Sequence, residues 1–180
     1  MRTTDAAIDR ITQILDSLKN FAHLDQAEYQ QVDVHEGIDS TLTLLEHQLT
    51  DQVKVERQYG NTPPIYSYPA ELNQVFMNVL LNSSQAIDGA GTIRIKTYAD
   101  QANVYIEISD SGRGIAQEKL ERIFDPDFSN KEDRVGLGLG LATSYNIVRK
   151  HNGFLRLQSE VGKGTSATII LPVEPTVART

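Results

Sequence analysis

Two neighbouring segments of alternating polarity constrain the fold of this chain more than any other feature of its sequence. Residues Ile93 to Tyr98 and Val104 to Ile108 alternate apolar and polar side chains, and residues 100–103 separate them as a turn. Successive side chains of a β-strand point to opposite faces, so this pattern predicts a half-buried hairpin. The apolar face requires a covering layer, whereas the polar face is expected to be largely solvated.

A helix that begins at Pro69 is predicted to supply much of that layer. Proline is tolerated in the first turn of a helix, and apolar residues follow it with helical spacing at Leu72, Val75, Phe76, Val79 and Leu80. Further helices are expected near residues 36–49 and 141–151, and further strands at 32–34, 54–59, 154–159 and 165–171. This order predicts an α+β fold, a two-layer sandwich in which a mixed β-sheet carries helices on one face.

An amphipathic helix is predicted at the N-terminus. Its apolar residues are spaced three and four positions apart, at Ile8, Ile11, Leu15, Leu18 and Ala22. A single helix of this length would be marginal in water, so we expect it to pair with partner helices in a homodimer of the full-length protein. The pattern begins at Met1 without a capping sequence, and we therefore expect the chain to be part of a longer protein.

Length and composition fit one soluble domain with a short appendage. We assign residues 1–30 to the N-terminal helix and a linker, 31–173 to the domain and 174–180 to a frayed tail. A net charge of −7 with scattered Lys and Arg argues against a nucleic-acid partner. Without cysteines, a signal peptide or a long apolar run, the chain is expected to be cytoplasmic and to make no membrane contact itself, even if the full-length protein is membrane-anchored.

The helix after Pro69 carries two asparagines, Asn78 and Asn82, four residues apart. Side chains at this spacing project from one side of a helix, so both amides could face one pocket. Neutral oxygen ligands suit Mg²⁺, which takes its other ligands from water and from substrate phosphates. Taken alone, such a pair is more often a set of surface or capping asparagines.

Two glycine-bearing motifs follow the asparagines. The motif DSGRG, residues 110–114, comes directly after the second hairpin strand. A carboxylate there can accept a hydrogen bond from an exocyclic amine, and glycines let a flat ring approach the backbone; the alternative is an ordinary tight turn. The motif GLGLG, residues 136–140, opens a helix, where backbone N–H groups and the helix dipole favour phosphate.

The order of these motifs resembles that of the histidine kinase catalytic domain. NVLLNSSQAI (78–87) is similar to its N box, DSGRGI (110–115) to its G1 box, IFDPDF (123–128) to its F box and GLGLGLA (136–142) to its G2 box. The resemblance runs from about Val32 to Pro172 and implies a Bergerat-type ATP-binding fold. The segment LKNFAHLD (18–25) resembles the second helix of the dimerisation and phosphotransfer domain, so residues 1–30 would hold part of that helix.

The resemblance implies ATP and Mg²⁺ as cofactors. Asp110 would accept a hydrogen bond from the adenine amino group, and Thr165 in the closing strand would support that recognition. Asn82 would coordinate Mg²⁺, with Asn78 beside it. The glycine-rich segments would shape the base pocket and approach the phosphates, through Gly112, Gly114, Gly136, Gly138, Leu139 and Gly140.

The segment between Gly114 and Gly136 resembles the ATP lid, with Phe124 and Phe128 as its apolar anchors. Lys131 and Arg134 are candidates for neutralising phosphate charge, and the alternative is that both are solvated surface charges.

Three residues depart from the family pattern. Ser83 replaces a usual alanine, Asp127 a usual phenylalanine, and Leu137 a threonine or small residue. Altered lid packing or weaker phosphate binding could result from these departures.

A kinase rather than a hydrolase is implied by Asn78. The gyrase-like and Hsp90-like branches carry a water-activating glutamate at this position, and an amide cannot act as a general base near neutral pH. The implied activity is transfer of the γ-phosphate to a histidine on a dimerisation helix, with a response regulator or receiver domain as partner.

None of the four histidines fits the acceptor. His23 lies near the end of the N-terminal helix, His35 at a strand-to-helix turn, and His47 and His151 look like surface helix residues.

Two other functions stay open at this stage. A serine kinase of the anti-sigma factor type shares the nucleotide site but lacks a phosphoacceptor hairpin, and the N-terminal helix argues against it. A nucleotide-gated interaction module would move its lid and helix on ATP binding without phosphoryl transfer.

Overall fold

The computed structural model describes residues 28–46, 48–49, 52–123 and 139–174 of the chain. Its strands are β1 (Gln30–Val32), β2 (Val53–Tyr59), β3 (Ile65–Ser67), β4 (Gly91–Ala99), β5 (Asn103–Asp110), β6 (Phe154–Glu160) and β7 (Gly164–Pro172). Its helices are α2 (Val34–Leu45), α3 (Pro69–Ala86), α4 (Gln117–Leu120) and α5 (Leu139–Lys150). The predicted N-terminal helix and nearly all of the predicted tail lie outside the described residues.

Five strands form one mixed sheet in the order β2–β4–β5–β7–β6. Strand β2 runs parallel to β4, and the other neighbouring pairs are antiparallel. Strands β1 and β3 form a separate antiparallel pair. The predicted hairpin is therefore present as β4 and β5, in the middle of the sheet rather than at its edge.

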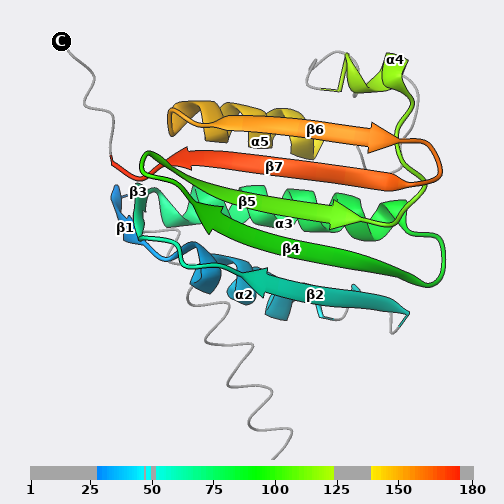
Figure 1. The fold of residues 1–180 in the computed structure, drawn as a ribbon, viewed down its shortest axis with the longest axis horizontal. Coiled ribbons are helices and arrows are strands. Elements are labelled where there is room, and N and C mark those ends of the chain that lie inside the picture. The colour runs from blue at the N-terminus through cyan, green and yellow to red at the C-terminus, as the bar shows by residue number, and fades with distance from the viewer. Residues whose placement is uncertain (1–27, 47, 50–51, 124–138, 175–180) are drawn as a thin grey trace, which may run out of the picture.

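The helices α2, α3 and α5 cover one face of the sheet, with α3 packed between the other two (Figure 1). This arrangement confirms the predicted α+β sandwich of a mixed sheet and one helical layer. Within the described residues, no helix combines the length and the apolar composition needed to cross a membrane.

The core lies between α3 and the two central strands. Ile95 of β4 and Ile108 of β5 are paired in register and face the helices, and both are fully buried. Phe76 and Val75 of α3 are also fully buried. The alternation in the hairpin and the helical spacing after Pro69 therefore describe the two sides of one apolar interior.

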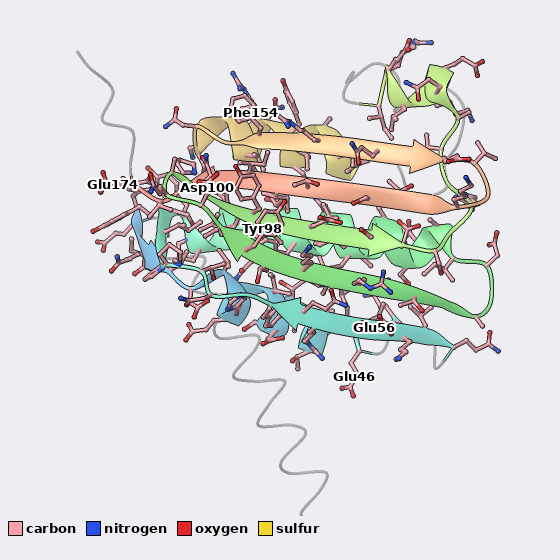
Figure 2. All side chains as sticks on the ribbon, in the orientation of Figure 1. Glu46, Glu56, Tyr98, Asp100, Phe154 and Glu174 are labelled. Atoms are coloured by element: carbon pink, nitrogen blue, oxygen red, sulfur yellow. The ribbon has the colours of Figure 1, made fainter. Side chains whose placement is uncertain are left out.

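The opposite face of the sheet carries one cross-strand row of large side chains. Tyr98, Tyr105, Ile170 and Phe154 are successive register partners across β4, β5, β7 and β6. The rings of Tyr98 and Tyr105 stack with centroids 4.8 Å apart, and Phe154 remains 52% exposed. Figure 2 labels Tyr98 and Phe154 in this row. The face away from the helices is therefore polar except for this one row of aromatic and apolar side chains.

Helix α2, predicted near residues 36–49, begins earlier than predicted. The strand expected at 32–34 ends at Val32, and α2 starts at Val34 because Asp33 caps it: the Asp33 carboxylate accepts a hydrogen bond from the His35 backbone N–H at 2.8 Å. Sequence periodicity also missed β3 and α4, which contain three and four residues and are too short to show a period.

His35 sits in this first helical turn, as expected for a strand-to-helix turn. Its ring stacks on Tyr59 at 4.3 Å, and its Nε2 atom lies 2.8 Å from the Thr97 hydroxyl.

The interpretation of His151 as a surface residue is wrong. His151 follows α5 directly and is only 3% exposed. Its Nε2 atom accepts a hydrogen bond from the Tyr68 backbone N–H at 3.1 Å, and its Nδ1 atom lies 2.8 Å from the Ile147 carbonyl oxygen. These contacts join the end of α5 to the start of α3, a tertiary relation that the local helical pattern could not reveal. His23 and His47 lie outside the described residues.

Truncation of a core residue in the central hairpin should destabilise the fold. Ile106 of β5 is fully buried, so Ile106→Ala is expected to lower the free energy of unfolding by about 2–5 kcal/mol, because it leaves a cavity between the sheet and the helices. Chemical denaturation measures this difference. The control Arg156→Ala, at an exposed position of β6, should stay within about 0.5 kcal/mol of wild type; equal effects of the two changes would contradict the assigned core.

Candidate functional site

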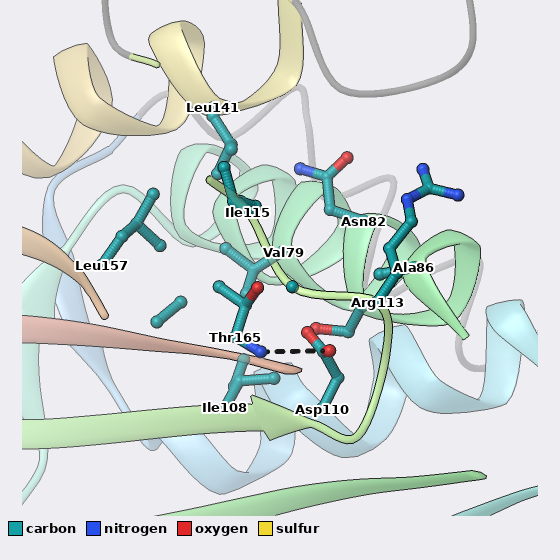
Figure 3. A pocket seen from close by; sticks show the side chains of 13 residues that line it. Val79, Asn82, Ala86, Ile108, Asp110, Arg113, Ile115, Leu141, Leu157 and Thr165 are labelled. Atoms are coloured by element: carbon teal, nitrogen blue, oxygen red, sulfur yellow. Dashed lines mark hydrogen bonds between the residues drawn. The ribbon is translucent and has the colours of Figure 1, made fainter. Parts of the chain in front are cut away.

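A pocket lies between the helical layer and the ends of the central strands (Figure 3). Its apolar walls come from every layer of the domain: Val79 and Ala86 of α3, Ile108 of β5, Leu157 of β6, Ala167 of β7 and Leu141 of α5. Its polar lining includes Asn82, Ser83, Asp110, Arg113 and Thr165. A largely apolar cleft with a few convergent polar groups suits a flat heterocyclic ligand.

Asp110 is the last residue of β5, and its carboxylate is held in a fixed orientation. The backbone N–H groups of Gly112 and Thr165 both donate to its Oδ1 atom, at 2.8 Å and 3.2 Å. The second of these bonds is the dashed line in Figure 3. Both donors belong to the backbone, so the carboxylate is oriented by the chain trace of β7 and of the loop after β5.

Burial raises the pKa of the Asp110 carboxyl above its ordinary value of 3.8. The two backbone hydrogen bonds, and one from the Ser83 side chain, act in the opposite direction by favouring the charged form. Ser83 is one of the three departures from the family pattern, and its side chain contributes a hydrogen bond to the Asp110 carboxylate.

Two glycines of the DSGRG motif are required by close packing. A side chain at Gly112 would collide with the Ala86 backbone carbonyl at the end of α3. Gly114 has a φ of 71°, and a side chain there would collide with the Glu160 backbone carbonyl. The motif can therefore pass between α3 and the β6–β7 turn only without side chains at these two positions.

Thr165 lines the pocket, and its backbone N–H donates to the Asp110 carboxylate. Its hydroxyl lies 2.8 Å from the Ser159 hydroxyl. Ser159 also accepts a hydrogen bond from the Ile115 N–H at 2.8 Å and donates to the Gly164 carbonyl at 3.0 Å. Sequence analysis missed Ser159, because nothing in its local pattern separates it from other polar residues of β6.

Asn82 extends from α3 into the pocket, on the side opposite Leu157 in Figure 3. Its amide nitrogen is buried and has no hydrogen-bond partner among the residues that the structure describes. A buried amide without a partner is costly, so this group is well suited to a ligand that completes its bonding. Arg113 lines the same pocket and was missed as a candidate, although it lies inside a motif that was recognised.

Asn78 makes different contacts from those expected. Its amide nitrogen donates to the Gly140 carbonyl at 3.0 Å and to the Ser144 hydroxyl at 3.1 Å, both on α5. Positions four apart on a helix differ by about 40° in direction, which is enough for Asn82 to reach the pocket while Asn78 reaches the neighbouring helix. The Asn78 amide nitrogen is thus directed to α5, and of the two asparagines Asn82 is the one that lines the pocket.

The glycine-rich segment is described only in part. Leu139 begins α5, and Gly140 packs so closely against Asn78 that an added Cβ would lie 3.2 Å from the Asn78 Cγ atom. The other lid and G2 candidates lie outside the described residues: Phe124, Asp127, Phe128, Lys131, Arg134, Gly136, Leu137 and Gly138.

Solved structures of sensor kinases share this fold. The mycobacterial sensor histidine kinase MprB superposes with a TM-score of 0.71 at 26% identity, over 83% of this chain and 100% of that one. The catalytic domain of the histidine kinase ThkA gives a TM-score of 0.73 at 22% identity, over 82% and 99% of the two chains. The fold is therefore that of the catalytic domains of histidine kinases.

The sequence leads to the same class. Residues 67–175 match the family of histidine kinase-, DNA gyrase B-, and HSP90-like ATPases, and the chain belongs to that family. It is 35% identical over 170 residues to the sensor histidine kinase ZraS of Escherichia coli (strain K12), covering 93% of this chain. The chain spans 36% of the length of ZraS.

The negative charge of Asp110 is expected to lower the stability of the folded domain. Because the folded-state pKa is raised, the ionised carboxylate costs stability, and this cost grows as the pH rises from about 3.8 through the folded-state pKa. The variant Asp110→Asn is therefore expected to be more stable than wild type near neutral pH, with the gap closing on acidification. Urea denaturation over a pH series measures the difference in free energy of unfolding between the two proteins.

Asp100 provides a matched control of opposite sign. Hydrogen bonds from the Ala102 backbone, the Tyr105 hydroxyl and the Asn103 backbone lower the pKa of the Asp100 carboxyl. Its charge therefore adds stability that is lost as the pH falls, and Asp100→Asn should be less stable than wild type at neutral pH. A destabilised Asp110→Asn at neutral pH would mean that the hydrogen bonds to Asp110 outweigh its burial.

Proposed function

We propose that this chain binds ATP with Mg²⁺ and transfers the γ-phosphate to a histidine outside these 180 residues, as the catalytic part of a two-component sensor kinase. The observation that carries the proposal is the Asp110 carboxylate, fixed by two backbone N–H groups inside an apolar pocket. The relatives support the kinase role through the family they share with this chain.

Recognition of adenine follows from the hydrogen-bonding chemistry of Asp110. An ionised carboxylate only accepts hydrogen bonds, and adenine presents an amino donor. The walls formed by Val79, Ile108 and Leu157 would contact the faces and edge of the ring. Guanine presents an acceptor oxygen in place of the amino group, which would leave the buried carboxylate unpaired.

Asn82 is the residue proposed to hold Mg²⁺. Asn82 lines the pocket, and its buried amide nitrogen has no hydrogen-bond partner among the described residues; rotation of the amide by half a turn would place the oxygen there instead. A bound Mg²⁺ would supply positive charge to neutralise the phosphates of ATP. Asn82 would orient that ion at the wall formed by α3.

The phosphates are proposed to lie toward the start of α5. Backbone N–H groups of the segment 136–140, with Gly136, Gly138, Leu139 and Gly140, would donate to them at a helix N-terminus. Lys131 and Arg134 are proposed to add positive charge from the lid. Arg113 lines the same pocket and is a further cation within the G1 motif.

Transfer to histidine is proposed in preference to transfer to water. Asn78, at the position of the water-activating glutamate of other branches, is an amide and donates to α5. In the transfer step, an imidazole nitrogen lone pair would form a bond to the γ-phosphorus while the bond to the ADP oxygen breaks. ADP would leave with that electron pair, and the imidazole would release its ring proton.

The acceptor histidine is proposed to lie on a dimerisation helix outside these 180 residues. His35 and His151 are each engaged in contacts within the domain. In the complete protein, a homodimer formed through the N-terminal helix would bring the acceptor to the site. A response regulator or receiver domain would then take the phosphoryl group.

Nucleotide preference tests the assignment of Asp110. The wild-type chain is expected to bind ATP more tightly than GTP by roughly ten- to a hundredfold, as measured by isothermal titration with Mg²⁺. Asp110→Asn replaces a carboxylate, which only accepts hydrogen bonds, by an amide that can also donate. ATP affinity should therefore fall, and the ratio of ATP to GTP affinity should approach one. Ser109→Ala, one residue earlier and paired with Ser166, serves as the control and should change neither.

Equal wild-type affinity for ATP and GTP would contradict the base assignment. Unchanged ATP binding in Asp110→Ala would contradict it as well, since that variant has no carboxylate.

Labelled ATP tests the reaction itself. Alone with γ-labelled ATP, the chain is expected to hydrolyse it slowly, because position 78 holds an amide in place of the water-activating glutamate. It is expected to label itself negligibly, because none of its four histidines fits the acceptor pattern. Addition of a helical peptide with an acid-flanked histidine should produce label on that histidine, and Asp110→Ala should abolish it. Label on serine would favour a serine kinase of the anti-sigma factor type. ATP binding without any label would favour an interaction module, and fast steady-state hydrolysis would favour the ATPase branch of the family.

A further inference from the structure

Three polar groups form a closed hydrogen-bonded triangle between α3 and α5. The Asn78 amide nitrogen donates to the Gly140 carbonyl at 3.0 Å and to the Ser144 hydroxyl at 3.1 Å. The Ser144 hydroxyl donates to the same Gly140 carbonyl at 2.7 Å. Both hydrogens of the Asn78 amide nitrogen are thereby used within the protein.

The triangle is tightly packed. Ser144 is fully buried, so loss of the Asn78 donor would leave the Ser144 hydroxyl without water to replace that hydrogen bond. Gly140 approaches Asn78 so closely that an added Cβ would lie 3.2–3.3 Å from Asn78 side-chain atoms. The glycine at position 140 therefore has a packing reason that is independent of phosphate.

The triangle also adjoins the pocket on two sides. Leu141, which directly follows Gly140, forms the α5 wall, and Asn82, one helical turn after Asn78, forms part of the α3 wall. A shift of the first turn of α5 relative to α3 would move these two walls apart. Asn78 is thus located where it can control the width of the site while its amide nitrogen donates only to α5.

We propose that Asn78 is a positioning residue whose amide nitrogen fixes the first turn of α5 against α3. The inference rests on the proposed nucleotide site. It separates the two asparagines of the helix into different roles: Asn82 faces the ligand, and Asn78 holds the wall beside it. Because Asn78 would hold a wall of the pocket and not a single group of the ligand, its loss should weaken ATP binding whether or not Mg²⁺ is present.

The test compares ATP affinity of the wild type and of single variants in Mg²⁺ and in EDTA. Asn78→Leu keeps a similar volume but removes the donor, and Ser144→Ala removes the middle partner of the triangle on α5. Each is expected to weaken ATP binding by about tenfold in both conditions, so the ratio of the two affinities stays at the wild-type value. Asn82→Ala, by contrast, is expected to lower affinity in Mg²⁺ and to leave it nearly unchanged in EDTA.

A double variant adds a readout that general loss of stability would not give. If Asn78 and Ser144 act through one triangle, the effects of Asn78→Leu and Ser144→Ala on affinity should be clearly less than additive. Thermal unfolding of each variant identifies any that fail to fold, and in that case Asn78→Ser, which retains a short hydroxyl donor, replaces Asn78→Leu.

The outcomes separate the inference from the function it rests on. A loss confined to the Mg²⁺ condition in Asn78→Leu would make Asn78 a metal-site residue and overturn the positioning role, with nucleotide binding intact. Wild-type affinity in both Asn78→Leu and Ser144→Ala would overturn it too. Failure of the wild-type chain to bind ATP in either condition would instead refute the proposed function.

Discussion

A buried carboxylate oriented by backbone N–H groups is the interaction on which the site depends. Asp110 ends β5, and its two backbone donors come from Gly112 in the following loop and from Thr165 in β7. Three segments must therefore be in register before the carboxylate has its orientation. Apolar walls disfavour its charge and raise its pKa, while the hydrogen bonds favour the charge. The site holds an acceptor at a cost in stability, as binding sites commonly do.

Helix α3 connects this site to the fold. Its apolar face, including Val75 and Phe76, covers the central hairpin, and its C-terminal end lies so close to the G1 loop that position 112 must be glycine. The same helix carries Asn78 toward α5 and Asn82 toward the pocket. One helix thus sets the position of the sheet, of the acidic loop and of the start of α5, which explains how a pocket with walls from five elements can be well defined.

Much of the fold could be predicted because its central elements repeat a pattern over many residues. Strands β4 and β5 alternate in polarity, and α3 has helical spacing over five turns, so their existence and type are confirmed. The errors lie where local pattern carries little information. Strand β3 and helix α4 are too short to show a period, α2 begins early because of the Asp33 cap, and His151 is buried by contacts with Tyr68, distant in sequence.

The sequence by itself determined the class of the domain and the residues at the centre of its pocket, because motif order and polarity pattern are local properties of the chain. Asp110, Thr165 and Asn82, which the motifs assign to one nucleotide site, line one pocket. Only the tertiary structure decided the separate directions of Asn78 and Asn82, the contact between Ser83 and Asp110, and the role of Ser159 as a junction of three segments. These contacts depend on which elements meet in space. The sequence pattern gives the spacing of side chains along an element, but it does not identify the neighbouring element that each side chain contacts.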